Sequence, residues 1–177
     1  VGNKSILETI VENFKVYGYT NIVMCLNYKS EIIQDYFGDG SEFGVNIEYI
    51  VEEKRMGTAG ALSLLKDNSK EPFFVMNGDL LTNVNFEKIH EFYLLNNAQA
   101  LMCVREYESQ VPYGVINIEN TKIVSVEEKP TQKFFVNAGI YMLNPEVLKY
   151  IPKNEFYNMT TLFEKLIDKD KNIISFP

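Results

Sequence analysis

The sequence predicts an α/β fold in which a mostly parallel sheet is covered by helices on both faces. Amphipathic helices and short apolar strands alternate along the first half of the chain, which is typical of right-handed crossover connections. The run Phe-Phe-Val-Met at residues 73–76 contains no polar side chain, as expected of a parallel strand that is buried on both faces. With 177 residues, 46% of them hydrophobic, the chain is long enough to enclose one substantial core.

The boundaries of the elements follow from capping signals and from the spacing of apolar residues. Ser5 and Glu8 have the Ser-x-x-Glu spacing of a capping box, which marks the start of a helix. Amphipathic spacing predicts helices over residues 5–17, 30–37, 86–95 and 159–168, and shorter ones beginning near Thr58 and Pro145. Apolar or alternating runs predict strands over residues 21–26, 45–51, 73–76, 100–104, 123–128, 135–142 and 173–176, and one beginning at Gly114.

Two details of these elements are also predicted. Helical spacing puts two groups of residues on the buried sides of their helices: Ile32, Ile33, Tyr36 and Phe37 in the first, and Leu162, Phe163, Leu166 and Ile167 in the second. The strand that starts at Ala100 is expected to end at Val104, because a polar segment begins at Arg105.

Composition limits the partners and the compartment. The formal net charge of -7 and the absence of a dense basic run argue against a nucleic-acid surface. No segment is apolar enough to cross a bilayer and no signal peptide is evident, so a cytoplasmic protein is expected. Cys25 and Cys103 lie in separate apolar runs, which favours buried, reduced thiols over a zinc site.

A carboxylate follows the apolar strand at residues 73–76. Gly78 permits a tight turn, and Asp79 then emerges at the carboxyl end of the strand, where open α/β sheets bind their ligands. A carboxylate at this edge is suited to a divalent metal. From these residues alone, an Asp79 that merely caps a turn is an equally good interpretation.

A segment rich in small residues, 56–61, joins a strand to a helix. Gly57 and its neighbours allow a flat ligand such as a nucleotide base to approach the backbone closely. Glu53 could accept hydrogen bonds from the amino and imino groups of a purine. The alternative is that Thr58 caps a helix while the small residues pack that helix against the sheet.

Residues suited to a sugar phosphate lie further along the chain. Gly114 offers close backbone approach before a strand, and Glu128 and Lys129 combine a carboxylate for hydroxyl groups with an ammonium for phosphate. Asn137 and Gly139 interrupt a strand, as happens where a ligand contacts the backbone. Each of these also fits an ordinary turn or a solvated sheet edge. His90, the only histidine, is interpreted as a solvated helix residue with no catalytic role.

Taken in order, these motifs resemble those of the sugar-1-phosphate nucleotidylyltransferase family over nearly the whole chain. The resemblance rests on Met-Gly-Thr-Ala-Gly-Ala at residues 56–61, Asn-Gly-Asp at 77–79, Tyr-Gly at 113–114, Glu-Glu-Lys-Pro at 127–130 and Asn-Ala-Gly at 137–139. It implies a Rossmann-like three-layer sandwich with a mostly parallel, mixed sheet and a nucleotidyltransferase core like that of the glycosyltransferase-A enzymes. The form of the first motif is similar to the guanylyl-transferring branch.

The resemblance also implies substrates and roles. In this family a sugar 1-phosphate attacks the α-phosphate of a nucleoside triphosphate, here with GTP favoured, and pyrophosphate leaves. Mg²⁺ is the implied cofactor, and homo-oligomerisation is left open. Carried over by position, the roles are catalysis and metal binding for Asp79, catalysis and phosphate binding for Lys129, nucleotide binding for Glu53, Gly57, Thr58, Asn77 and Gly78, and sugar binding for Gly114, Glu128, Asn137 and Gly139.

The departures from the family pattern restrict this interpretation. The family opens with a strand and a G-x-G-T-R loop that grips the triphosphate, and this sequence lacks both. Residues 1–177 are therefore interpreted as a single nucleotidyltransferase domain truncated at both ends and inactive alone. One alternative is a non-catalytic regulatory domain of the same fold. This alternative is disfavoured by the presence of Asp79, Glu128 and Lys129. A Rossmann oxidoreductase is disfavoured, because no G-x-G-x-x-G follows a strand.

Overall fold

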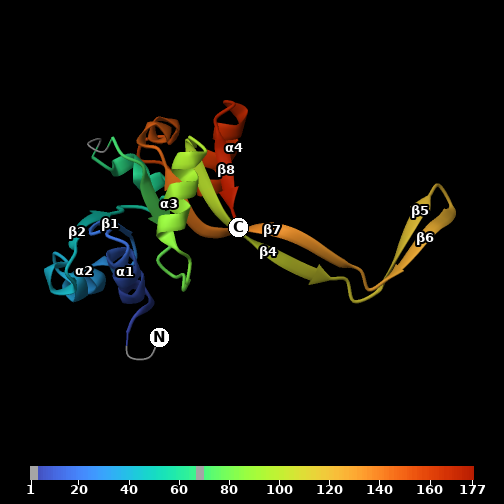
Figure 1. Ribbon diagram of the computed structural model, residues 1–177, viewed down its shortest axis with the longest axis horizontal. Helices are drawn as coiled ribbons and strands as arrows, with labels where there is room; N and C mark the ends of the chain where they lie inside the picture. Colours follow the sequence, from blue (N-terminus) through green and yellow to red (C-terminus); the bar gives the residue numbers. More distant parts are fainter. Residues whose placement is uncertain (1–3, 67–69) are drawn as a thin grey trace.

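The computed structural model describes residues 4–66 and 70–177, and Figure 1 shows their arrangement. The helices are α1 (Ile6–Val16), α2 (Ser30–Phe37), α3 (Phe86–Leu95) and α4 (Met159–Asp168), with the 3-10 helices η1 (Ser41–Phe43), η2 (Gly60–Leu64) and η3 (Pro145–Tyr150). The strands are β1 (Asn21–Leu26), β2 (Asn46–Val51), β3 (Phe73–Met76), β4 (Ala100–Gln110), β5 (Gly114–Glu119), β6 (Lys122–Glu128), β7 (Thr131–Leu143) and β8 (Ile173–Phe176). Most of the predicted helices and strands are confirmed to within a residue or two.

The central sheet is mixed. Its strand order is β3-β7-β4-β8, and β1 and β2 form a separate parallel pair. Strand β7 is antiparallel to both β3 and β4, whereas β8 is parallel to β4. Strands β3, β4 and β8 therefore run in one direction and β7 in the other, which confirms the expected mixed sheet, although only one of its three pairings, β4 with β8, is parallel.

Both faces of this sheet are covered. Alternate residues of β7 enter two different cores: Tyr141 and Leu143 pack with α4, η2 and η3, while Ile140 and Met142 pack with α3. This period of two is the ordinary pleat of a strand. The predicted three-layer arrangement is thus confirmed, and it fixes the position of every residue along β7 from 139 onward.

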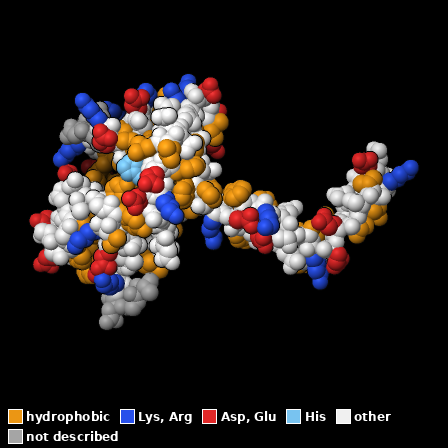
Figure 2. Space-filling model, in the orientation of Figure 1, with side chains coloured by type: hydrophobic (Ala, Val, Ile, Leu, Met, Phe, Trp, Pro, Cys, Tyr) orange, Lys and Arg blue, Asp and Glu red, His pale blue; other side chains and the backbone are white. Residues whose placement is uncertain are grey.

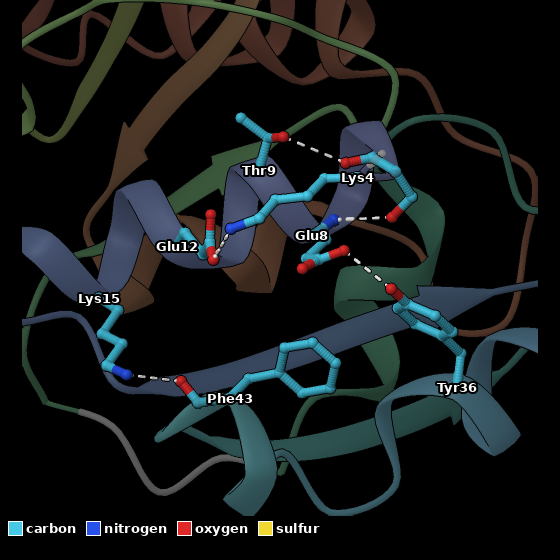
Figure 3. A network of polar contacts seen from close by, with 8 residues as sticks. Lys4, Glu8, Thr9, Glu12, Lys15, Tyr36 and Phe43 are labelled. Atoms are coloured by element: carbon cyan, nitrogen blue, oxygen red, sulfur yellow. Dashed lines mark hydrogen bonds and ion pairs between the residues drawn. The ribbon is translucent and has the colours of Figure 1, made fainter. Parts of the chain in front are cut away.

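A third cluster joins α1 to the parallel pair. Val11 of α1 packs with Met24 of β1 and Ile47 of β2. Polar contacts supplement this packing (Figure 3): the Tyr36 hydroxyl donates to the Glu8 carboxylate at 2.8 Å, and Lys15 Nζ donates to the carbonyl of Phe43 at 2.8 Å. The start of α1 is fixed by Ser5, whose hydroxyl accepts the Glu8 amide at 3.1 Å, as the capping pattern predicted.

A two-stranded arm projects from the body of the protein. It consists of the outer parts of β4 and β7 and of the hairpin formed by β5 and β6 (Figure 1). Hydrophobic side chains remain exposed along it (Figure 2), including Ile118 of β5 and Phe135 of β7. The predicted end of β4 at residue 104 is therefore wrong. Pairing continues to Gln110 opposite Thr131, because a ribbon exposed on both faces tolerates polar residues.

Strand β3 matches its predicted environment in part. Its four residues are each only half-buried, and its partner β7 is antiparallel. Alternate residues of β3 pack against the two cores, Phe73 and Val75 on one side and Phe74 and Met76 on the other, so the predicted coverage of both faces is confirmed. Within the described residues β3 is paired along one edge only, and that partner is antiparallel. An apolar run predicts that a strand contacts a core, but it does not predict whether the neighbouring strand is parallel or antiparallel.

Several expected burials are also wrong. Cys103 is buried, and burial raises the pKa of its thiol to about 12, but Cys25 is exposed. Ile32, Tyr36 and Ile167 are exposed on their helices, each at the margin of the apolar stripe. His90 is not simply solvated, since its Nδ1 lies 2.8 Å from the Tyr19 hydroxyl.

Among residues 4–66 and 70–177, no helix has the length and apolarity needed to span a membrane.

The contrast between neighbouring residues of α4 gives a test of the packing. Leu166 is fully buried and Ile167 is 66% exposed. Leu166→Ala is expected to lower the free energy of unfolding by about 2–5 kcal/mol, because it leaves a cavity in the core. Ile167→Ala is the matched control and should change it by only about 0.5 kcal/mol. Chemical denaturation measures both, and equal losses would contradict this placement of α4.

Candidate active site

The candidate site is built around the turn that follows β3. The amide of Asn77 donates to the carbonyl of Gly139 at 3.0 Å, extending the pairing of β3 with β7 by one residue. Gly78 and Asp79 come next and are exposed. The structure thus brings together Asn77, Gly78, Asp79 and Gly139, which the sequence placed in different motifs.

Asn137 and Gly139 form a locally determined turn within β7. The side-chain oxygen of Asn137 accepts the Gly139 amide at 2.8 Å, and its Nδ2 donates to the Tyr141 hydroxyl at 2.7 Å. Burial raises the pKa of Tyr141, and the bond from Asn137 opposes that shift. Gly139 has φ +74°, which L side chains rarely adopt. Both ends of the Asn137 amide are therefore used in hydrogen bonds that hold the backbone around Gly139.

This turn is a bulge in the sheet. Between Met102 and Val104 the β4 strand advances by two residues, while its partner on β7 advances by four, from Tyr141 to Asn137. The extra residues of β7 are accommodated by the left-handed conformation at Gly139. Bulges of this kind redirect neighbouring side chains, and they occur frequently beside active sites.

A cavity of about 440 Å³ opens beside the bulge. This volume lies within the range of small-molecule sites. The turn after β3, both strands at the bulge and the end of the chain contribute to its wall, whose residues are Leu80, Leu81, Thr82, Val84, Cys103, Val104, Arg105, Asn137, Ala138, Ile140, Phe176 and Pro177. Most of the wall is apolar, with a few polar groups.

The other residues predicted to bind the sugar lie on the arm. Gly114 and Glu128 are opposite each other on β5 and β6, and a Cβ atom at Gly114 would lie 3.1 Å from the Glu128 carboxylate. Lys129 follows with φ 49°, and its carbonyl accepts from Gln110 at 3.3 Å. Strand β7 begins at Thr131, six residues before Asn137, so roughly 20 Å of strand separates the two groups at about 3.4 Å per residue.

The residues predicted to bind the nucleotide base make packing contacts. The Thr58 hydroxyl accepts the amide of Met159, the first residue of α4, at 2.8 Å. A Cβ atom at Gly57 would lie 2.6 Å from the carbonyl of Tyr157. Gly57 and Thr58 therefore adapt the chain to the segment before α4, much as the alternative interpretation proposed, although the capped helix is a different one. Glu53 is exposed in the turn after β2.

The residues present fit a magnesium site in which the protein supplies only one or two ligands. Among the described residues no group of three or more His, Cys, Asp or Glu side chains is arranged to hold a metal. Mg²⁺ commonly takes only one or two carboxylates from a protein and completes its shell with water and substrate phosphates. Asp79 is an exposed carboxylate next to the cavity wall at Leu80, so it can supply one such ligand.

Sequence reasoning missed one charged residue of the cavity wall. Arg105 was assigned to a polar segment outside the sheet, but it lies on β4 opposite Val136 and lines the cavity. The alternation of Leu101, Cys103 and Arg105 along an extended strand would have placed Arg105 on the cavity side. The position of the bulge could not have been inferred, since it depends on pairing with a distant segment.

The fold and the cavity define an α/β protein with a candidate small-molecule site at the carboxyl end of β3. Comparison with known families makes this specific. The model of the family described as nucleotidyl transferase matches residues 1–177, so the chain belongs to that family. The resemblance inferred from the motifs is thereby confirmed.

Curated relatives point to one branch of the family. The chain is 35% identical over 161 residues to a probable mannose-1-phosphate guanylyltransferase 1 of Oryza sativa subsp. japonica, a match covering 85% of this chain and 44% of the relative. It is 36% identical over 158 residues to a mannose-1-phosphate guanyltransferase of Yarrowia lipolytica, again covering 85% and 44%. The chain thus spans about half the length of the curated relatives it matches.

Solved structures support the fold. HddC from Yersinia pseudotuberculosis superimposes with a TM-score of 0.72 at 22% identity, covering 98% of this chain and 76% of that one. A putative glucose-1-phosphate thymidylyltransferase from Bacillus anthracis gives a TM-score of 0.73 at 23% identity, covering 97% and 73%. At these identities the likeness concerns the fold alone.

The turn at Gly139 can be tested against a second glycine of similar conformation. Gly139 and Gly18 both have positive φ, but a Cβ atom at Gly139 would lie 2.8 Å from Asn77 Nδ2, whereas one at Gly18 meets nothing within 4 Å. Alanine at either position should cost roughly 1–2 kcal/mol for the backbone alone. Gly139→Ala is expected to cost about 1 kcal/mol more than Gly18→Ala in thermal or chemical unfolding, because the ends of the Asn77 and Leu80 side chains must shift to admit the new methyl group. Equal costs would contradict the close approach of Asn77.

Proposed function

We propose that the protein containing this chain transfers a guanylyl group from GTP to a sugar 1-phosphate, with mannose 1-phosphate the first candidate. The single observation that carries the proposal is the joining of Asn77, and so of the exposed Asp79, to the Asn137–Gly139 bulge beside a cavity of ligand size. Membership of the nucleotidyl transferase family supports the reaction class. The names of the matched relatives support the choice of base and sugar.

The chemistry requires positioning and electrostatics more than covalent catalysis. The phosphate of the sugar attacks the α-phosphate of the triphosphate in line, and pyrophosphate departs. Mg²⁺ held by Asp79 would neutralise charge on the phosphate oxygens. In this proposal the backbone at Gly139 faces the sugar, and Asn137 fixes that backbone through its two hydrogen bonds. Glu128, Lys129 and Gly114 contribute to sugar binding if the arm closes on the body.

The nucleotide assignments are the least direct part of the proposal. Gly57 and Thr58 make packing contacts in the structure, and any contact with a base would come from their backbone groups. Glu53 is exposed and available to a purine. We further propose that the 177-residue chain alone is inactive, since residues 1–177 lack the G-x-G-T-R loop that holds the triphosphate in this family.

The proposal is tested by product formation. A longer protein containing this chain, with GTP, mannose 1-phosphate and Mg²⁺, is expected to form GDP-mannose and pyrophosphate, whereas the 177-residue chain should form neither. Anion-exchange chromatography separates the nucleotide sugars. Binding of both ligands by the longer protein without any product would instead favour a non-catalytic regulatory domain. Substituting ATP, UTP and dTTP tests the base, and glucose 1-phosphate tests the sugar.

The role of Asp79 has its own test. In the longer protein Asp79→Asn is expected to lower kcat roughly hundredfold or more, which is the usual effect of removing a major electrostatic group. Because Asp79 is exposed, its unfolding midpoint should stay unchanged. Asp168→Asn is the matched control, since Asp168 is an exposed aspartate at the end of α4. Full activity of Asp79→Asn at saturating Mg²⁺ would rule out Asp79 as a metal ligand.

A further inference from the structure

The hydroxyl group of Tyr141 is a buried polar group next to the bulge of β7. Tyr141 is 2% exposed, and its ring packs on Phe163 with 5.8 Å between the ring centroids. The residue also lies in the middle of the sheet, opposite Val75 of β3 and Met102 of β4. Dense packing on all sides holds such a side chain in one place. The hydroxyl of Tyr141 is therefore a fixed point from which neighbouring groups can be oriented.

The orientation of the Asn137 amide follows from its two partners. A backbone N–H can only donate, so the oxygen end of the amide faces Gly139, at 2.8 Å. The nitrogen end faces the Tyr141 hydroxyl at 2.7 Å, and that hydroxyl accepts. Because an amide group is planar, hydrogen bonds at both ends fix its plane and the direction of its second N–H donor. Removing the Tyr141 hydroxyl would leave the amide free to turn about its bond to Gly139.

The hydrogen bonds continue from Asn137 to the turn that carries Asp79. The Gly139 amide donates to Asn137, and the Gly139 carbonyl accepts from the amide of Asn77 at 3.0 Å. Asp79 follows Asn77 by two residues. Three hydrogen bonds thus connect the core, through β7, to the turn after β3. Hydrogen bonds that are linked in this way reinforce one another.

We propose that Tyr141 is a positioning residue for the candidate active site. Through Asn137 it fixes the backbone of Gly139 and the turn that places the Asp79 carboxylate. The inference rests on the proposed function, because that function assigns the sugar to Gly139 and the metal to Asp79. Tyr141 is not among the residues that line the cavity, so it acts only through its neighbours. Its effect is to keep the groups on β3 and β7 in one relative arrangement.

Tyr141→Phe tests this role, because it removes the hydroxyl and keeps the ring that packs in the core. In the 177-residue chain the amides of Gly139 and Asn77 are expected to exchange with deuterium about twofold to tenfold faster, the usual effect of losing one hydrogen bond. Tyr93→Phe is the matched control. Tyr93 is also 2% exposed, but within the described residues its hydroxyl has no hydrogen-bond partner. Two-dimensional NMR measures the exchange of single amides.

The exchange rates decide the assignment. Faster exchange at Gly139 and Asn77 in Tyr141→Phe, with wild-type rates in Tyr93→Phe, supports it. Wild-type rates in Tyr141→Phe would overturn it. A uniform increase that includes the pairing of β4 with β8 would also overturn it, because that result shows a general loss of stability. The route through the amide is tested in the Asn137→Ala background, where Tyr141→Phe should have no further effect on either rate. A further increase there would contradict this route.

Turnover in the longer protein separates this inference from the proposed function. Tyr141→Phe is expected to lower kcat/KM for mannose 1-phosphate by about tenfold, because the reacting groups are less well aligned, whereas Tyr93→Phe should match the wild type. If the exchange rates support Tyr141 but the wild type forms no GDP-mannose, the proposed function fails and the link from Tyr141 to the Asp79 turn stands. If GDP-mannose is formed and Tyr141→Phe keeps the wild-type kcat/KM, the positioning role fails and the function stands.

Discussion

The position of β7 between β3 and β4 determines the rest of the site. Its pairing with β3 ends in the bond from Asn77 to Gly139, and its pairing with β4 is interrupted at the same point by the bulge. The two cores on either side hold β7 from Gly139 onward in one register. A shift of one residue would reverse Ile140 and Tyr141 between the cores, so the sheet cannot slide and the turn at Gly139 is fixed in place.

The elements of the fold were largely predictable, because local sequence specifies them. The Ser5 cap, the apolar runs of β1 and β3 and the amphipathic period of α4 depend on neighbours in the chain, and their boundaries were predicted closely. The direction of the strand paired with β3 was not predictable, since that partner is almost seventy residues away. The extent of β4 was underestimated for the same reason: the strand continues because β7 continues opposite it.

The site shows the same division between local and distant causes. The emergence of Asp79 after the turn at Gly78 was predicted from the sequence, and so was the interruption of β7 at Asn137 and Gly139. Packing by Gly57 and Thr58 was one of two interpretations of their segment, but the sequence could not identify the partner, because the segment that contacts them, around Tyr157 and Met159, is a hundred residues further on. The sequence does not distinguish a glycine that is approached by a ligand from one that is approached by another part of the backbone.

The arm and the body place their residues with different precision. Ile116 and Ile118 of the hairpin are exposed, and a two-stranded ribbon without a core is marginally stable in water. Gly114 and Glu128 are therefore positioned only by their own ladder. Asn137 adjoins a sheet packed on both faces, where side chains and backbone are held by many neighbours. Because a site requires rigid support, the bulge at Asn137 and Gly139 is better supported than the hairpin.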